Sequence, residues 1–472
     1  MSKKPMYLKR KASSKILVLL IVLAFLAILH LVVLHLLAKN EEEKVIEQEE
    51  PAKEEVILQS EFKGRVEEIV APKSQIKAYY MQQKSNLVAL SFMFDQAGYA
   101  YTPQGKEGLA QIAAATLKEG AGWWTAKELR NLLGSKGIKI GFAAERDVFS
   151  GSLIFPKDQM GDAIKFLREI FKNPHFEKKY VDSAKDKNIK LLQVEKENPQ
   201  TELSLAFDNA IYGDFAYGRN PLGRIEDVQR INRRDLLKFV GSYLGKNKIY
   251  AGISGDLTKQ EAEELLDGLF KNLPYVADKD IGLPDINWQQ QKLQISRTQE
   301  QDIVMYAAKG TCRKCTDFYP LYIANYIFGG AGLSSRANQT LREKEGLTYG
   351  IYSNLELGDK SDIITAVFSS AKDKTGKAKE LFTQEWNKVG NEGFSEEELR
   401  QAKDYLLASF NLRFISIAGI ADMLAYMQKY DLGVDFLQKR NQMVEDVDLQ
   451  QLNTVAKKYF TNDVLQAEIG NF

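Results

Sequence analysis

An arginine and a tyrosine seven residues apart, Arg342 and Tyr349, are the side chains best suited to polar catalysis. A guanidinium and a phenol O–H can both donate hydrogen bonds to developing negative charge, as in the stabilisation of an oxyanion. The pair follows a glycine-rich turn at 329–332. The spacing taken alone favours a structural interpretation, in which Arg342 pairs with Glu343 or Glu345 and Tyr349 packs in a core.

Cys312 and Cys315 form a C-x-x-C pair and are the only cysteines of the chain. Such a pair can form a disulfide, act as a redox dithiol or supply half of a zinc site. Neither a second C-x-x-C motif nor a pair of histidines accompanies it to complete a metal site. We expect the pair to lie outside the cytosol, where disulfides persist, so a small structural disulfide is favoured. Free thiols and dithiol catalysis remain alternatives.

The chain has three histidines, and only one of them, His175, lies outside the apolar N-terminal segment. A zinc site built on two imidazoles therefore cannot assemble within the body of one chain. His175 follows Asn-Pro, which is typical of a loop or the start of a helix. The chain also has no P-loop, no G-x-G-x-x-G and no G-x-S-x-G pattern, which removes support for nucleotide binding or serine hydrolysis.

The N-terminus is strongly basic although the formal net charge of the whole chain is only +1. Residues 1–15 contain six basic residues and no acidic one. Removing these six from the 64 basic residues leaves 58 against 63 acidic ones, so the rest carries about −5. A mildly acidic body argues against nucleic acid as a partner, because phosphate binding needs a basic face.

Residues 16–38 form an uncharged apolar run, long enough as a helix at about 1.5 Å per residue to cross a bilayer. The cations before it predict a cytoplasmic stub (1–15) and a transmembrane signal anchor (16–38). A cleaved signal peptide is the alternative, but its apolar core would be shorter. The glutamate-rich segment 39–60 is then an acidic tether that leads to a body on the far side of the membrane.

Strand-like and helix-like segments alternate along the body from about residue 60. Capping boxes begin three of the helices, at Thr125, Thr258 and Ser395. The predicted strands are 88–94, 148–155, 303–308, 349–356 and 362–369. The predicted helices include 105–118, 160–172, 177–197, 319–328 and 374–389. This order predicts an α+β fold with two halves, 61–275 and 293–472, joined by a proline-containing linker at 276–292.

Three stretches of the body together resemble the insulinase/pitrilysin-type zinc metallopeptidases. They are GYAYTPQGKEGLAQIAAATLKEGAG, the segment from NPQTELSLAFDNAIYGDF to GSYL, and FGGAGLSSRANQTLREKEGLTYGIYSN. The resemblance covers about residues 65 to 470. It implies two homologous α/β-sandwich domains that form half of a clam-shell, as in the processing-peptidase branch, where two chains enclose a peptide-sized chamber. With the N-terminal anchor, it predicts a single-pass protein of the bacterial inner membrane with its body in the periplasm.

The family's zinc motif, H-x-x-E-H, places two histidine ligands and a glutamate general base on one helical face. The matching positions here are Gln111, Ala114 and Ala115, so all three functional groups are absent. The position of the third ligand, a glutamate in the family, falls near Leu191. The resemblance therefore implies an N-terminal domain with a degenerate zinc site and a chain that binds no metal or other cofactor.

The same resemblance favours a functional role for Arg342 and Tyr349, because active members use an arginine and a tyrosine at this spacing to hold the substrate carbonyl. Some members of the branch divide the work, so that a zinc-less subunit supplies this pair to a zinc-bearing homologue. The sequence therefore predicts a non-catalytic subunit of a heteromeric zinc peptidase, with no peptidase activity alone, a zinc-bearing partner and peptide substrates. The alternative is a peptide-binding or envelope-complex scaffold without a role in proteolysis.

Overall fold

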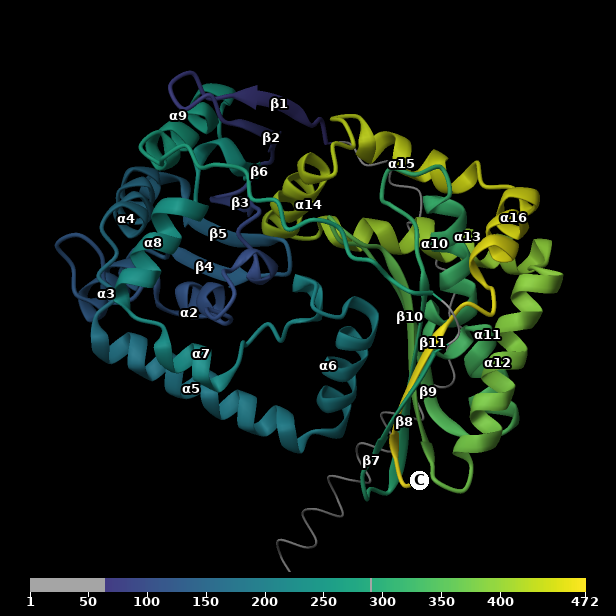
Figure 1. Cartoon of the computed structure of the whole chain (residues 1–472). Coiled ribbons are helices and arrows are strands. Elements are labelled where there is room, and N and C mark those ends of the chain that lie inside the picture. The colour runs from purple at the N-terminus through teal and green to yellow at the C-terminus, as the bar shows by residue number, and fades with distance from the viewer. Residues whose placement is uncertain (1–63, 289–290) are drawn as a thin grey trace, which may run out of the picture. The chain divides into compact units, whose positions relative to one another are not determined.

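The computed structural model describes residues 64–288 and 291–472 (Figure 1). The predicted cytoplasmic stub (1–15), transmembrane anchor (16–38) and acidic tether (39–60) lie outside the described residues. The described residues belong to one compact unit.

No single helix of the described part is long and apolar enough to span a bilayer. The helical segments Glu396–Phe414 and Ile417–Lys429 reach the necessary length and hydropathy only together, and they are bent by 112°. The second of them, α14 (Ile417–Lys429), packs on strands of the first sheet. Core packing therefore accounts for its apolar side chains.

Six strands of the described part form the first sheet, in the order β1-β2-β6-β3-β5-β4. β3 (Leu87–Asp95) lies inside the sheet and pairs antiparallel with β6 (Ile249–Gly255) and β5 (Val148–Pro156). Its sequence LVALSFMFD is largely buried, as expected of a strand that is covered on both faces. The outer strands are β1 (Glu67–Val70), β2 (Lys77–Gln82) and β4 (Lys139–Ala144).

Helices α4 (Met160–Lys172) and α9 (Lys259–Phe270) pack against each other beside this sheet. Phe171 of α4 and Phe270 of α9 meet Phe92 of β3, with ring centroids 6.0 and 5.3 Å away in edge-to-face geometry. The other helices of this half are α2 (Leu109–Thr116), α3 (Ala126–Ser135), α5 (Lys178–Glu197), α7 (Ile225–Arg230) and α8 (Arg233–Tyr243).

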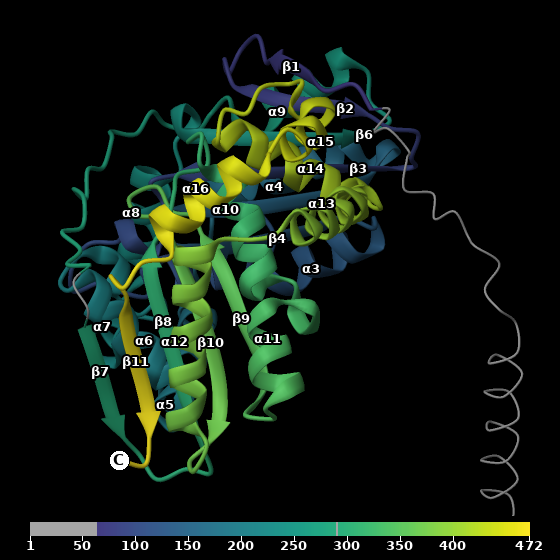
Figure 2. The same ribbon diagram turned by 90° about the vertical axis from the view of Figure 1, so that its right-hand side faces the viewer.

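Five strands of the described part form the second sheet, in the order β7-β11-β8-β10-β9, which Figure 2 presents face on. The long strands β8 (Gln301–Lys309) and β10 (Ile363–Ala371) are antiparallel, and β9 (Thr348–Glu356) forms one edge. β7 (Gln291–Ser296) forms the other edge and runs parallel to β11 (Leu465–Gly470).

One face of the second sheet is covered by α12 (Thr375–Glu392), α16 (Leu449–Tyr459) and α10 (Phe318–Asn325). Phe382 and Trp386 of α12 lie in this core. The remaining helices are α11 (Arg336–Asn338), α13 (Glu396–Phe410) and α15 (Phe436–Glu445). Two π-helical turns, η5 (Tyr326–Gly330) and η7 (Gln339–Lys344), precede β9.

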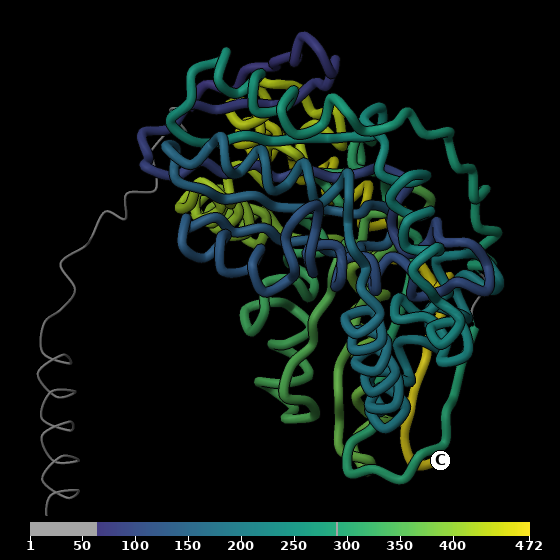
Figure 3. Tube along the Cα trace, turned by 90° about the vertical axis from the view of Figure 1, so that its left-hand side faces the viewer, coloured from purple at the N-terminus to yellow at the C-terminus, as the bar shows by residue number. Residues whose placement is uncertain are grey.

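Each half contributes a helix to the sheet of the other half, as Figures 1 and 3 show from two sides. α14, from the second half, packs on β6, β3 and β2 of the first sheet. A Cβ at Gly252 of β6 would collide with the α14 backbone at Ala421, so glycine is required for this close approach. In return, α6 (Pro199–Tyr212) packs on β11, β8 and β7 of the second sheet.

The predicted mixture of helices and strands is confirmed in its coarse form, as a mixed α/β fold with two sheets. Helix 160–172 and the three capping boxes have their predicted positions. The helix predicted over 105–118 is shorter and begins at Leu109. The reason is backbone conformation, because Gly105 and Gly108 have φ values of +77° and +91°, which a right-handed helix does not admit.

Candidate functional site

Helix α2 carries the positions that the resemblance matches to the zinc motif, and it packs into the core of the first half. Ala113 is fully buried and Ala114 is 8% exposed, whereas Ala115 faces solvent. Gln111 Nε2 donates a hydrogen bond of 2.9 Å to the carbonyl oxygen of Ala144 in β4. The helix therefore binds its own sheet through the side chain that stands at the first ligand position.

The third ligand position offers no carboxylate either. Leu191 lies on α5, which packs beside α2, and its side chain is 43% exposed. The nearby Glu195 accepts a 2.8 Å hydrogen bond from Asn220. Within residues 64–288 and 291–472, no group of three His, Cys, Asp or Glu side chains is arranged to hold a metal ion. These residues do not fit zinc.

The second half places Arg342 and Tyr349 on two arms of one turn. Arg342 lies in the π-helical turn η7, and Tyr349 is the second residue of β9. The helical arm ends at Gly346 (φ +59°), and the Leu347 N–H donates a 2.8 Å hydrogen bond to the Leu341 carbonyl. The chain then turns directly into the strand.

A buried asparagine, Asn338, fixes the two arms to each other. Its Oδ1 accepts a 2.8 Å hydrogen bond from the N–H of Ile351, and its Nδ2 donates one of 2.7 Å to the carbonyl of the same residue. The side chain thus occupies the outer edge of β9 as a neighbouring strand would. The sequence analysis missed this residue, since an asparagine before a helical turn is also typical of an ordinary cap.

The guanidinium and the phenol of this turn have no partner among the described residues. Arg342 has no ion pair and no side-chain hydrogen bond there, because Glu345 pairs instead with Lys377. Tyr349 is 79% exposed and makes no ring contact within that part. Two donors held on a rigid turn, with none of their hydrogen-bonding capacity used, can stabilise a negative charge supplied from outside the chain.

In the structure Cys312 and Cys315 are joined by a disulfide between β8 and α10. Between them, Arg313 is only 9% exposed, and its guanidinium lies 4.1 Å from the centroid of the Phe318 ring. It donates a hydrogen bond of 3.1 Å to the Tyr426 hydroxyl of α14. The disulfide-bonded turn therefore presents a structural arginine, and the described residues bring no histidine to it.

His175 and two adjacent tryptophans, Trp123 and Trp124, lie near one another beyond the C-terminal end of α2. The ring nitrogen Nε2 of His175 is 2.8 Å from the carbonyl oxygen of Gly122. The backbone N–H of His175 donates a hydrogen bond to the carbonyl oxygen of Gly120. Trp124 packs edge-to-face on Phe166 at 5.1 Å, whereas Trp123 is 93% exposed. His175 is therefore a turn residue, and the two tryptophans divide between the core and the surface.

A cluster of aspartates lies where a loop of the second half meets the first sheet. Tyr217 Oη donates a 2.5 Å hydrogen bond to Asp147, and the Asp359 N–H donates one of 3.2 Å to the same carboxylate. Lys429 of α14 pairs with Asp359 at 3.1 Å. The pKa of Asp362 is raised to about 6, mainly by burial, with the charges of Asp359 and Asp147 contributing in the same direction. No spacing pattern in the sequence indicated this cluster.

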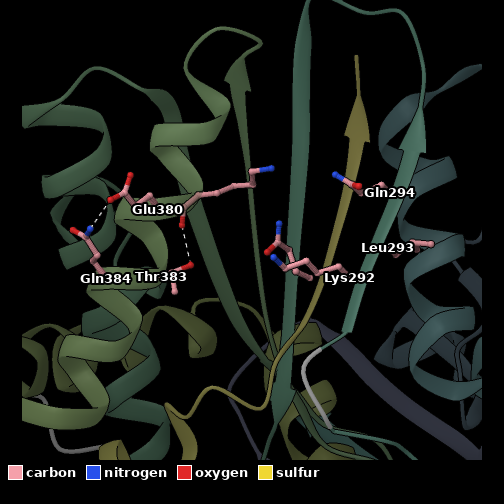
Figure 4. A pocket seen from close by; sticks show the side chains of 8 residues that line it. Lys292, Leu293, Gln294, Glu380, Thr383 and Gln384 are labelled. Atoms are coloured by element: carbon pink, nitrogen blue, oxygen red, sulfur yellow. Dashed lines mark hydrogen bonds between the residues drawn. The ribbon is translucent and has the colours of Figure 1, made fainter. Parts of the chain in front are cut away.

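The described surface also has a groove of about 360 Å³ at the β7 edge of the second sheet (Figure 4). It is lined by polar side chains of β7, β11 and α12, among them Lys292, Gln294 and Thr383. None of the predicted site residues lines it. The candidate functional site is therefore the turn that carries Arg342 and Tyr349, rather than this groove.

Comparison with known families agrees with this geometry. Residues 230–406 match the family model described as Peptidase M16 inactive domain. The chain is a homologue of the M16 peptidases. The resemblance to the insulinase/pitrilysin-type family, in its zinc-less form, is thereby confirmed.

The M16 relatives have low identity but match over most of their length. A protein of Helicobacter pylori named non-peptidase homolog YmxG is 21% identical over 402 residues, which are 84% of this chain and 93% of the relative. An uncharacterized zinc protease of Rickettsia bellii is 23% identical over 400 residues, 82% of this chain and 92% of the relative.

Solved structures share the M16 fold. A peptidase M16 inactive domain from Pseudomonas fluorescens has a TM-score of 0.80 at 21% identity, covering 86% of this chain and 98% of that chain. The periplasmic protease PqqL from Escherichia coli has a TM-score of 0.75 at 12% identity, and the match covers 86% of this chain but 46% of PqqL. A chain of complex III from Candida albicans has a TM-score of 0.71 at 13% identity, and the match covers 86% of this chain and 96% of that chain.

Proposed function

We propose that this chain is the zinc-less, non-catalytic subunit of a heteromeric zinc peptidase, and that Arg342 and Tyr349 reach into the active site of a zinc-bearing homologue. One observation carries the proposal. The positions matched to the zinc motif hold Gln111, Ala114 and Ala115, whereas the side chains of Arg342 and Tyr349 have no partner among the described residues. A scaffold has no chemical need for such a pair.

The division of labour needs a second chain of the same fold. The match to PqqL covers less than half of that periplasmic protease, so one chain of the present length corresponds to about half of it. We infer that the partner supplies the other half, and that the two chains enclose a chamber for peptide substrates. The partner's zinc activates the water, while this chain donates hydrogen bonds to the carbonyl oxygen of the substrate.

The location we propose is the bacterial inner membrane, with one crossing and the body in the periplasm. It rests on the six basic residues of segment 1–15 and the uncharged run at 16–38. An alkaline phosphatase fusion after residue 60 tests this topology, because the enzyme is active only outside the cytoplasm. An inactive fusion that is still expressed would contradict it.

Co-purification followed by metal analysis of each separated chain tests the proposed pairing. We expect this chain to be isolated with a homologue that carries H-x-x-E-H, with about one zinc per partner and none on this chain. The proposal would be ruled out by stoichiometric zinc on this chain. It would also be ruled out if the stable, purified chain did not bind the zinc-bearing homologue.

The second candidate function is a scaffold for peptide binding or for an envelope complex, without a role in proteolysis. It is favoured by the likeness to a chain of complex III, which covers 96% of that chain. The two functions differ in what the loss of Arg342 and Tyr349 does. A scaffold would keep its partners and its full biological effect without either side chain, whereas the proposed peptidase subunit would keep its partner and lose turnover.

A further inference from the structure

The alternation of side chains along β9 is interrupted next to Tyr349. Tyr349 and Gly350 together oppose a single residue of β10, Ser369, so the strand contains a β-bulge at this point. With unbroken pairing, Tyr349 would share the face of Ile351, which is fully buried in the core under the helices. The bulge places Tyr349 on the opposite face of the sheet, where it is 79% exposed.

The side chain of Thr348 holds the bulge in place. Its hydroxyl donates a 2.7 Å hydrogen bond to the Ser369 carbonyl across the strand pair. The same oxygen lies 3.2 Å from the Gly350 nitrogen and accepts a hydrogen bond from its N–H. A bulge leaves backbone groups without a ladder partner, and one hydroxyl satisfies a group on each strand here.

A second tyrosine, Tyr352, lies on the same face. It pairs across the sheet with Val367 and is 56% exposed. Its hydroxyl lies 3.3 Å from the point that a Cβ of residue 350 would occupy, so its ring lies back along the strand over Gly350. The absence of a side chain at Gly350 thus allows the Tyr352 phenol to approach the position of Tyr349.

The outer edge of β9 does not offer its backbone at this point to a peptide. Both backbone groups of Ile351 are bonded to Asn338, and the Ser353 carbonyl accepts a 3.3 Å hydrogen bond from Asn325. On the open face, α6 packs on β7, β11 and β8, toward the other edge of the sheet. A ligand at this edge therefore meets tyrosine side chains and not a free strand edge.

We propose that Thr348 is a positioning residue, and that the bulge it holds presents Tyr349 and Tyr352 side by side to an extended peptide. The inference rests on the proposed function, and it adds a second substrate-contacting tyrosine and the device that orients the first. The two phenols offer flat apolar surface and O–H donors, which suits a peptide bound by stacking and by hydrogen bonds to its carbonyl groups.

The positioning step can be tested on the full chain without any partner, by nitration of tyrosines with tetranitromethane and peptide mass spectrometry. Thr348→Val removes the hydroxyl at nearly constant volume, and we expect the nitration rate of Tyr349 to fall about fivefold. Thr348→Ser keeps the hydroxyl and should restore the rate. Tyr405, which is 56% exposed on α13, is the matched internal control. An unchanged rate at Tyr349 in Thr348→Val would overturn the positioning role.

The role in peptide contact is tested with the zinc-bearing homologue and a fluorogenic decapeptide. We expect Thr348→Val to lower kcat about tenfold with little change in KM, and Tyr352→Leu to raise KM about fivefold. Gly350→Ala adds a Cβ against the Tyr352 ring and should raise KM without reaching Thr348. This variant keeps the test decisive even if Thr348→Val folds poorly.

The outcomes separate the inference from the proposed function. If Tyr349→Phe lowers turnover while Thr348→Val, Tyr352→Leu and Gly350→Ala behave as the wild type, the inference is overturned and the proposed function stands. If Tyr349→Phe itself leaves turnover unchanged, the proposed function fails and the inference fails with it.

Discussion

By the resemblance to the zinc peptidases, helix α2 and the turn that carries Arg342 and Tyr349 are expected to match the two parts of one catalytic centre, and in the structure the two regions differ in how their polar side chains are hydrogen-bonded. On α2, Gln111 is hydrogen-bonded to β4 and Ala113 is fully buried. On the turn, Asn338 is hydrogen-bonded to the backbone of Ile351, whereas the side chains of Arg342 and Tyr349 have no partner among the described residues. The first region has become a structural element, and the second keeps its polar groups available.

The difference shows that a fold of this kind can give up one part of a site and keep the other rigid. On α2, Ala113 and Ala114 are buried and Gln111 is hydrogen-bonded to the Ala144 carbonyl, so this helix contributes to the stability of the fold. In the turn, the buried side chain of Asn338 is hydrogen-bonded to β9 and so fixes the strand that carries the exposed Tyr349. Such fixed orientation is expected where a ligand from another chain must meet a hydrogen-bond donor at a defined position.

The largest effect on turnover is expected from a substitution in the turn that carries Arg342 and Tyr349. Arg342→Ala removes one donor to the oxyanion, and we expect kcat in the reconstituted pair to fall about 10²- to 10³-fold. Steady-state kinetics on a fluorogenic peptide measures this. Arg413→Ala, which removes an arginine from the turn between α13 and α14, serves as the control and should leave kcat unchanged. Equal losses in the two variants would mean that Arg342 has no special role.

The packing of helix α2 is tested by replacing its alanines with a larger side chain. Ala113→Leu adds volume at a fully buried position and should lower the free energy of unfolding by about 1–3 kcal/mol. Ala115→Leu, on the exposed side of the same helix, should change it by less than about 0.5 kcal/mol. Urea unfolding of both variants provides the comparison. If the two changes cost the same, α2 is not packed as the structure describes.

The aspartate cluster that joins the halves gives a pH-dependent prediction. The pKa of Asp362 is raised by burial, and the neighbouring Asp359 and Asp147 add to the effect, so its charged form opposes folding. This cost is fully present above pH 6, shrinks as the pH falls below 6, and vanishes near the ordinary value of about 4. Asp362→Asn should therefore stabilise the protein at pH 7.5 by about 1–2 kcal/mol.

Thermal unfolding of wild type and Asp362→Asn between pH 4 and 8 measures this effect. The difference between the two curves should grow as the pH rises from 4 to 6 and stay at its full size above pH 6. Lys429 faces the same cluster through its pair with Asp359, so Asp359→Asn is a useful contrast that removes an ion pair. A constant difference across the pH range would show that the Asp362 carboxylate is not the cause.

The smallest effect concerns the hydrogen bond that ties α2 to the sheet. Gln111→Ala leaves the Ala144 carbonyl without its donor and should cost about 1 kcal/mol of unfolding free energy. Gln104→Ala, at an exposed loop position, is the matched control. A cost no greater than that of the control would mean that Gln111 does not hold the helix to β4.

The sequence predicts five of the eleven described strands, namely β3, β5, β8, β9 and β10, and it gives no indication of the irregular backbone beside Tyr349. The predicted strand 349–356 and helix 160–172 agree with β9 and α4 to within a residue, because the apolar pattern along each segment is a local signal. The bulge beside Tyr349 was not foreseen, because a single glycine in a strand does not reveal its pairing register. The exchange of α6 and α14 between the sheets is a long-range contact with no local signal.

The candidate site divides in the same way. The resemblance matches Gln111, Ala114 and Ala115 to the zinc motif, and none of these three residue types supplies the motif's ligands or base. For Arg342 and Tyr349 the sequence leaves two interpretations open: a structural role, with Arg342 paired to a neighbouring glutamate and Tyr349 in a core, or a role in stabilising an oxyanion. Only the three-dimensional arrangement places Glu345 against Lys377 and Tyr349 on the open face. Asn338, Thr348 and Asp362 act through tertiary contacts, so no spacing rule could identify them.

The central claim is that this chain contributes to catalysis at another chain's zinc. The most direct test is turnover by the zinc-bearing homologue after addition of wild-type chain or of the Arg342→Ala, Tyr349→Phe double variant, with binding checked in both cases. We expect equal binding, and turnover that is lost by about 10²-fold or more with the double variant. Full turnover with a bound double variant would contradict the account.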